Sequence, residues 1–390
     1  MKKVISSEPI PIKMWLNDIE NSTLEQAKNL ANLPFAFKHI ALMPDTHMGY
    51  GMPIGGVLAT KDVIIPNAVG VDIGCGMCAV RTNLTDISWK SLVELQKEIQ
   101  KRIPVGFRRH KTPQDELLMP DVTKYRKEDL LVVAFEWENA LTSLGTLGGG
   151  NHFIEIQKGD DGFIWIMIHS GSRNLGKKVA DHYNSVAKHL NQKWYSAVPS
   201  SHQLAFLPLD TEETYRYQAE MQYCVDYAFA NRRLMMNRIQ QIIKRMTSNV
   251  EFGEIINVAH NYARTEHHFK TNVKVHRKGA TSACEGEIGI IPGSQGTSSY
   301  IVKGKGNSES FESCSHGAGR AMSRKQARRE LDLNQEVHQM DEQGIVHRMT
   351  SQDDLDEAAG AYKPIDEVME NQKDLVKILV KLKPLMVIKG

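Results

Sequence analysis

Hydrophobic and polar positions recur along this chain with two different periods, which together predict mixed secondary structure. Apolar residues three or four positions apart are typical of helices with one buried face, and short apolar runs between turn residues are typical of strands. The helical pattern covers residues 24–32, 88–102, 126–144, 174–193, 211–247, the segment from His316 to about 331, and 366–381. Strands are predicted at 39–43, 153–157, 163–169, 254–260, 271–276, 286–291 and 298–303, with a strand-like tail ending in Lys389 and Gly390. Residues 332–362 are polar and are expected to form loops.

Glycine-rich segments interrupt this pattern throughout residues 45–320. Such segments turn the chain sharply or bring the backbone close to a ligand. No internal repeat, low-complexity tract or Pro-, Ser- or Gly-rich linker divides the chain. We therefore expect an α+β fold in which residues 1–390 form one large domain with mixed β-sheets.

Composition and charge narrow the function classes. The 390 residues carry 48 Lys and Arg against 46 Asp and Glu, and a net charge of +2 excludes a generally polybasic nucleic-acid binder but not a local basic groove. Five cysteines cannot all be paired in disulfides. The N-terminal residues lack the apolar core of a signal peptide, and the apolar run 163–168 is too short to span a bilayer. We expect a cytoplasmic protein whose cysteines and histidines are free for chemistry.

The segment VGVDIGCGMC, residues 69–78, is open to several interpretations. Cys75 and Cys78 form a C-x-x-C pair, but no second pair completes a structural zinc site. A redox pair would need a helix that starts at these cysteines, and the pattern shows none. Asp72 and Cys75 could instead be metal ligands, or the two cysteines could simply be small core residues in a glycine turn.

Three histidines lie beside predicted strand ends or tight turns. His152 follows the turn of GTLGGGNHFIEI, His169 ends an apolar strand, and His260 ends another. Each alone is better explained by a structural role. Together with Asp72 and Cys75 they form a set of nitrogen, oxygen and sulfur donors that suits two ions sharing a thiolate, such as Mn²⁺ or Zn²⁺.

Two further segments offer groups for an anionic ligand. Arg173 in HSGSRNLG precedes a predicted helix and is a candidate for anion binding, although a surface role is the alternative. In SCSHGAGR, His316 is predicted at a helix N-terminus, where the helix dipole would keep the imidazole neutral and nucleophilic and could bind phosphate. The glycine turn before His152 matches neither a P-loop nor a dinucleotide-binding fingerprint.

These motifs together resemble the RtcB family of RNA ligases. The shared blocks are PDTHMGYGMPIGGV, GVDIGCGM, GTLGGGNHFIE, HSGSRNLG, AHN, RKGAT, IPGSQGTSSY, SHGAGR and the terminal KG, in that order. The resemblance implies a single α+β domain with a central metal-lined cleft. It also implies a GTP- and Mn²⁺-dependent enzyme, with Zn²⁺ or Co²⁺ as possible substitutes, that joins RNA 2′,3′-cyclic phosphate or 3′-phosphate ends to 5′-hydroxyl ends.

The resemblance also implies roles for individual residues. His316 would carry GMP covalently and transfer it to the RNA 3′-phosphate, and Cys75 would bridge two metals held by Asp72 and His152 on one side and by His169 and His260 on the other. The guanylate site would comprise Asn151, Phe153, Glu155, Asn261, Ser294, Ser299 and Lys389, with Gly317, Ala318 and Gly319 around its phosphate. Asp45 would support the metal site from behind, and Arg173, Lys278 and Arg324 are the candidates for RNA phosphates.

Two departures from the family pattern bear on specificity. The chain is shorter than many members between AHN and SHGAGR, and Gln295 replaces a methionine often found after PGS. Trimmed loops and a near-neutral charge favour a specialised broken RNA, such as a tRNA or rRNA, as the partner. The protein is expected to be a monomer that binds no membrane. The alternatives are a metal-dependent RNA-end phosphoesterase without ligation, which needs neither His316 nor Lys389, and a non-enzymatic RNA-binding protein.

Overall fold

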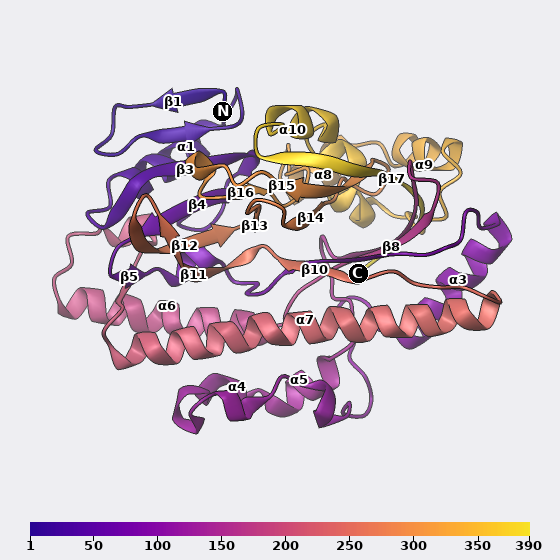
Figure 1. Ribbon diagram of the computed structural model, residues 1–390, viewed down its shortest axis with the longest axis horizontal. Helices are drawn as coiled ribbons and strands as arrows, with labels where there is room; N and C mark the ends of the chain where they lie inside the picture. Colours follow the sequence, from indigo (N-terminus) through magenta and orange to yellow (C-terminus); the bar gives the residue numbers. More distant parts are fainter.

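Two large sheets stand on a layer of helices in the computed structural model, which describes residues 1–390 (Figure 1). The strands are β1 (Lys3–Ile5), β2 (Ile12–Met14), β3 (Ala36–His47), β4 (Ile54–Thr60), β5 (Val63–Ile64), β6 (Gly76–Arg81), β7 (Phe153–Gly159), β8 (Ile164–Ser170), β9 (Leu207–Pro208), β10 (Ile256–Ala259), β11 (Asn261–His268), β12 (Thr271–Lys278), β13 (Ala280–Ser282), β14 (Ile288–Ile291), β15 (Ser299–Gly304), β16 (Ser313–Ser315) and β17 (Val376–Lys389). The helices are α1 (Asn21–Ala31), α2 (Pro66–Val69), α3 (Trp89–Arg102), α4 (Leu131–Phe135), α5 (Trp137–Ser143), α6 (Leu175–Lys193), α7 (Glu212–Met246), α8 (Arg324–Glu330), α9 (Leu333–Glu342) and α10 (Ile365–Asn371).

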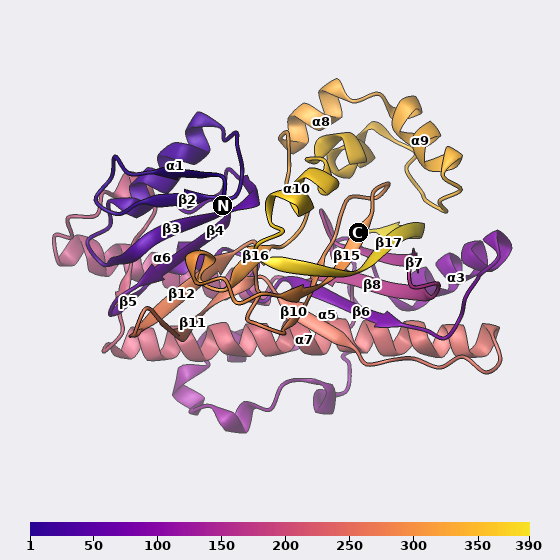
Figure 2. The same cartoon turned by 45° about the horizontal axis from the view of Figure 1, so that its top comes forward.

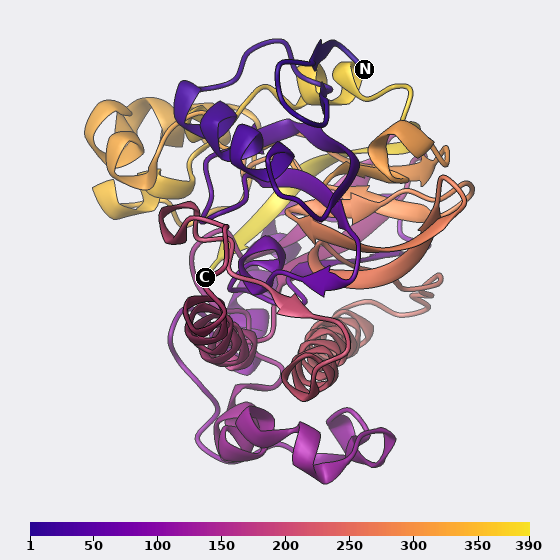
Figure 3. The same ribbon diagram turned by 90° about the vertical axis from the view of Figure 1, so that its left-hand side faces the viewer.

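The six-stranded sheet has the order β1-β2-β3-β4-β12-β11, and the seven-stranded sheet has the order β10-β6-β8-β7-β17-β15-β14. Helices α6 and α7 run side by side beneath the sheets, and Figure 3 shows both nearly end-on. Helices α4 and α5 lie outside α7 (Figure 1), while α8, α9 and α10 stand on the opposite side of the molecule (Figure 2). None of the helices combines the length and apolar character needed to cross a bilayer.

Alternation along β8 shows how the core orients the site. Ile164, Ile166 and Ile168 belong to the core cluster that contains side chains of α3 and α7. Trp165 and Met167 belong to a different cluster on the other face of the sheet. Because successive strand side chains point to opposite faces, His169 shares the face of Trp165 and Met167 and points away from α7.

The α+β prediction is confirmed, and α1, α3, α6 and α7 confirm four predicted helices. The single helix predicted over 126–144 is wrong: a 3₁₀ turn at Lys127–Asp129 is followed by the short helices α4 and α5. The cause is tertiary, because Glu220 on α7 accepts hydrogen bonds from the backbone N–H groups of Val132 and Val133, at 2.5 and 3.0 Å, and so caps a new helix start.

The C-terminal third differs most from the sequence prediction. Residues 332–362 are not all loop, since they contain α9, and the predicted helix over 366–381 is replaced by α10 and the 14-residue strand β17. Strand β17 pairs with β15 on one side and with β7 on the other, and its register shifts between Pro384 and Met386. Proline lacks the N–H that a helix interior or a regular ladder needs, so it lies at this irregularity.

A buried ion pair stabilises the end of the six-stranded sheet. Arg277 on β12 is fully buried and donates to both carboxylate oxygens of Glu266 on β11, with Nη2 at 3.0 Å from Oε2. His268 Nε2 lies 2.8 Å from the same Oε2. Burial by itself would raise the pKa of Glu266, but Arg277 and His268 outweigh it and hold that pKa far below its ordinary value.

We expect Glu266→Gln to lower the free energy of unfolding by about 3 kcal/mol at pH 7, because Arg277 would keep a buried charge without a counter-ion. Glu266 has a lower pKa in the folded than in the unfolded chain, so its stabilisation is present above the unfolded value of about 4.3 and is lost as the pH falls below it. Urea unfolding of both proteins between pH 7 and about 3.5 checks this. A stability difference that stays constant over that range would contradict it.

Candidate active site

One row of side chains crosses the seven-stranded sheet where its strands meet the glycine-rich turns. His169 on β8 lies opposite Met77 on β6 and opposite Phe153 on β7, and Phe153 lies opposite Lys389 on β17. Cross-strand partners have Cβ atoms about 5 Å apart. Register therefore brings His169, Phe153 and Lys389 together from distant parts of the chain.

The thiol of Cys75 is the centre of a cluster beside this row. Its Sγ lies 3.4 Å from Nε2 of His152 and 3.3 Å from Nε2 of His169. Two triads share this sulfur, Asp72–Cys75–His152 and Cys75–His169–His260, and within each triad the ligand atoms all lie within 4.8 Å of one another. These triads group the same residues as the two ligand sets that the family resemblance implies.

The protonation states of the imidazoles and the carboxylate suit metal binding. Burial lowers the pKa values of His169 and His260 well below the ordinary value, so both imidazoles are neutral and keep a lone pair. Burial would raise the pKa of Asp72, but the contact with His152 outweighs it and keeps the carboxyl ionised. Nδ1 of His260 is buried without any hydrogen-bond partner.

Ionisation of the Cys75 thiol requires a nearby cation. Burial, followed by the neighbouring Asp72 charge, raises the pKa of Cys75 well above the ordinary value, so this thiol ionises only when a positive charge replaces its proton. Thiolate, imidazole and carboxylate donors together fit borderline divalent ions. The residues present therefore fit two metal ions that share Cys75.

Arg232 on α7 holds the loop that carries Asp72 and Cys75. Its fully buried guanidinium donates to the carbonyl oxygens of Gly74 and Ser170 at 2.9 and 2.8 Å. The apolar pattern of residues 211–247 predicts only a packing face and gives Arg232 no role. An arginine at a position of the apolar stripe is the one signal that could have pointed to it.

His316 is held by Asp45 rather than by a helix. Its Nδ1 lies 2.6 Å from Oδ2 of Asp45, and its backbone N–H and that of Gly317 donate to the same oxygen at 3.0 and 3.3 Å. Burial would raise the pKa of Asp45, but the contacts with His316 outweigh it and lower that pKa. An ionised Asp45 accepts a hydrogen bond from Nδ1–H of His316, and in that tautomer Nε2 carries the lone pair.

The prediction that His316 begins a helix is therefore wrong. His316 follows β16, and α8 starts only at Arg324, where the Ser323 side chain caps it. Gly319 explains the difference, because its φ is +74° and a Cβ atom there would lie 2.3 Å from the carbonyl oxygen of Asp45. The Gly-Ala-Gly run is a turn packed against β3. The His316 imidazole is therefore oriented by Asp45, not by a helix dipole.

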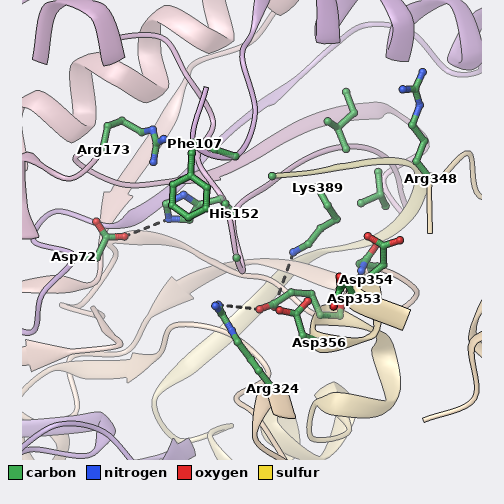
Figure 4. Close-up of a pocket in the computed structure, with 18 of the residues that line it drawn as sticks. Asp72, Phe107, His152, Arg173, Arg324, Arg348, Asp353, Asp354, Asp356 and Lys389 are labelled. Atoms are coloured by element: carbon green, nitrogen blue, oxygen red, sulfur yellow. Dashed lines mark hydrogen bonds and ion pairs between the residues drawn. The ribbon is translucent and has the colours of Figure 1, made fainter. Parts of the chain in front are cut away.

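Two cavities meet at this cluster. The smaller has a volume of about 310 Å³, and its lining includes Asn151, Phe153, Glu155, His169, Ser294, His316, Gly317, Ala318, Gly319, Arg324 and Lys389. The larger has a volume of about 1030 Å³ and contains Asp72, His152, Arg173, Arg324 and Lys389 (Figure 4). One cavity thus reaches Asp72 and His152 of the Cys75 cluster, and the other reaches His169.

Besides Asp45, Cys75 and His260, three residues predicted to contact RNA or guanylate line neither cavity. Lys278 is buried, and its ammonium donates to the backbone carbonyl oxygens of Asn67 and Tyr50; burial lowers its pKa to about 7. The structure therefore does not offer it to RNA phosphates. The Asn261 side chain joins the backbone of Asp72 and Gly279 at 3.0 and 2.7 Å, and Ser299 accepts a hydrogen bond from Gln157 at 3.1 Å.

Glu357 is a polar residue at the junction of the two cavities that the sequence analysis missed, because it lies in the segment assigned to loops. This buried carboxylate ends a 3₁₀ turn, Gln352–Glu357, and lies 3.0 Å from Nη2 of Arg324 and 4.0 Å from Nζ of Lys389. The Nε2 of Gln295 donates to its backbone oxygen at 2.8 Å. Glu357 therefore positions the side chains of Arg324 and Lys389, which the sequence predicted to contact RNA and guanylate.

Comparison with known proteins gives the same family as the motifs. A family model described as tRNA-splicing ligase RtcB matches residues 26–129 and 126–390. The RNA-splicing ligase RtcB of Escherichia coli strain K12 is 38% identical over 410 residues, covering 100% of this chain and 99% of the relative. The tRNA-splicing ligase RtcB of Thermococcus kodakarensis is 33% identical over 447 residues, covering 95% and 92%, and that of Nanoarchaeum equitans is 32% identical over 461 residues, covering 98% and 95%. This chain therefore belongs to the RtcB family.

Proposed function

We propose that this protein is an RNA ligase that joins a 2′,3′-cyclic phosphate or 3′-phosphate end to a 5′-hydroxyl end, with GTP as co-substrate and two divalent ions, Mn²⁺ in the first instance. Its substrate would be a broken tRNA or rRNA in the cytoplasm. The observation that carries the proposal is the position of His316, oriented by Asp45 at 2.6 Å, in a cavity that also reaches the Cys75 cluster.

In the first step, Nε2 of His316 attacks the α-phosphorus of GTP. A P–N bond forms, the bond to the β-phosphate oxygen breaks, and pyrophosphate leaves. Asp45 fixes the ring orientation and holds the proton on Nδ1, so that the lone pair on Nε2 points into the cavity. Asp45 also offsets the positive charge that the imidazole gains when the new bond forms.

Two transfers then complete the reaction, after water has opened any cyclic phosphate. An oxygen of the RNA 3′-phosphate attacks the GMP phosphorus, and the P–N bond to His316 breaks. The 5′-hydroxyl next attacks the activated RNA phosphorus and GMP leaves, which restores the protein. Metal ions held by the two triads would supply positive charge to the phosphoryl oxygens and lower the pKa of the attacking hydroxyl.

The smaller cavity offers groups suited to a purine nucleotide. Phe153 presents a ring, with Nζ of Lys389 5.7 Å from its centre. Burial is the main cause that raises the pKa of Glu155 to about 8, so this carboxyl is largely protonated at neutral pH until a cationic or hydrogen-bond donor group approaches. A base that donates hydrogen bonds, such as guanine, would stabilise the ionised form.

Sealing of a labelled 3′-phosphate RNA to a 5′-hydroxyl RNA tests the proposal. We expect a joined product that requires both GTP and Mn²⁺, and GMP released with each junction. The competing function is a phosphoesterase that uses the same metal cluster; it would release inorganic phosphate or open the cyclic phosphate without GTP and without joining. That product pattern would refute the ligase assignment.

Asp45→Asn is expected to slow formation of the protein–GMP adduct by about 100-fold or more, because an amide neither holds the Nδ1 proton nor offsets the imidazolium charge. Single-turnover labelling with GTP measures this rate. Thr46→Ser, which keeps the hydroxyl of the next residue, is the matched control and should leave the rate nearly unchanged. An Asp45→Asn rate equal to that of the unaltered protein would contradict the role assigned to Asp45.

A further inference from the structure

Phe107 presents a bare aromatic ring at the larger cavity. Its relative exposure is 103%, the highest among the large hydrophobic side chains, and it belongs to the lining of that cavity together with Asp72 and His152. Figure 4 shows Phe107 on the same side of the cavity as the Asp72–His152 pair. A fully exposed ring contributes nothing to the core, and its face is free to contact a ligand in the cavity.

The backbone beneath this ring is firmly held. Gly106, with φ at +66°, donates to the carbonyl oxygen of Gly148 at 2.8 Å and accepts from Nη2 of Arg173 at 3.1 Å. Leu147 in turn donates to the carbonyl of Pro104 at 2.9 Å. The segment before Phe107 is thus joined to the glycine turn that carries His152, and the Phe107 backbone is held beside the Cys75 cluster.

Three arginines without a carboxylate partner line the same cavity. Arg109, Arg173 and Arg348 line the cavity, and none of them has a carboxylate oxygen within 4.0 Å; Nη1 of Arg109 donates only to the Asn139 side chain, at 2.6 Å. On the facing wall, Glu357 is paired with Arg324 at 3.0 Å, and Asp356 and Asp353 are paired with Arg328 at 2.9 and 3.4 Å. Asp354 accepts backbone N–H groups there. Arg109, two residues after Phe107, and Arg173, which donates to the Gly106 carbonyl oxygen, therefore offer cations to an anion on the side of the cavity that carries Phe107.

We propose that Phe107 and Arg109 form a binding site for one unpaired nucleotide of the RNA close to the break, with the base stacked on the Phe107 ring and an adjacent phosphate bound by Arg109. This inference rests on the proposed function and specifies how that site takes its RNA. Aromatic faces combined with cations are the means by which proteins bind single-stranded nucleic acid, whereas a duplex keeps its bases stacked and hidden. The enzyme would thus require at least one unstacked nucleotide beside the break.

The test compares Phe107→Ala with Phe107→Trp, which keeps a stacking face, and with Phe135→Ala, a control at a phenylalanine that is 86% exposed but outside both cavities. RNA affinity is measured by filter binding, and adduct formation with GTP is measured separately because it needs no RNA. We expect Phe107→Ala to weaken RNA binding about tenfold, with adduct formation, Phe107→Trp and Phe135→Ala close to the unaltered protein.

RNAs with a single abasic nucleotide at each of the positions flanking the break identify the contact. One such RNA should bind the unaltered protein about tenfold more weakly and lose nothing further with Phe107→Ala. Arg109→Gln should reduce the slope of log Kd against log salt by about 0.7, whereas Arg329→Gln, on the outer side of α8, should not. Equal RNA binding by Phe107→Ala, or penalties that add at every abasic position, would overturn the proposal. If RNA binding depends on Phe107 as expected but no RNA is sealed, the result would instead overturn the ligase function.

Discussion

Replacing His316 with alanine is expected to abolish the covalent GMP adduct, a loss of at least about 1,000-fold, because it removes the one imidazole of the smaller cavity that a carboxylate, Asp45, orients through Nδ1. Incubation with labelled GTP and Mn²⁺ followed by denaturing electrophoresis measures the adduct, which should be labile in acid and stable in alkali, as expected of a phosphoramidate. An adduct of unchanged yield in His316→Ala would refute the mechanism.

A second substrate separates loss of chemistry from loss of fold. RNA already activated at its 3′ end with GMP needs only the attack of the 5′-hydroxyl, a step in which His316 forms no bond. His316→Ala should therefore join this RNA to a 5′-hydroxyl end while failing with ordinary 3′-phosphate RNA. Failure with both substrates in a folded variant would show that His316 does more than carry GMP.

The second large effect is expected at Cys75. Cys75→Ala removes the one ligand atom that both triads share, so both ions lose a donor and sealing should fall at least about 100-fold. Titration with Mn²⁺ measures the metal itself: we expect about two equivalents for the unaltered protein and much weaker binding at both positions for the variant. Unchanged binding of two equivalents would contradict the shared-thiolate arrangement.

Cys78 provides the matched control in the same segment. It is completely buried within the core cluster beneath the sheet and contacts none of the metal ligands, and burial raises its pKa to about 12. Cys78→Ala should cost some stability, about 1 kcal/mol, but leave both metal binding and sealing intact. The two cysteines of one C-x-x-C pair would thus separate into a metal ligand and a core residue.

Local periodicity was sufficient for the long elements of the fold. Helices α3, α6 and α7 have apolar stripes of ordinary spacing, and packing against the sheets reinforces their intrinsic preference. Local periodicity failed where tertiary contacts decide which element forms. Glu220 caps the start of α4, and β17 is a strand because β15 and β7 pair with it on both sides. Strand β11 was not predicted, because its pattern of mostly polar residues is defined by pairing with β12.

The sequence by itself determined the family and named the candidate reactive groups, because its spaced motifs contain residue types whose chemistry is intrinsic: a thiol, three imidazoles and a carboxylate, with His316 apart from them. Only the tertiary structure decided their surroundings. In the folded chain both triads share the Cys75 sulfur, and Asp45 contacts His316 where a helix was expected. Lys278 is buried and donates to backbone carbonyl oxygens. Proximity, burial and hydrogen-bond partners arise from strands paired across the whole chain, and no local pattern of residues encodes them.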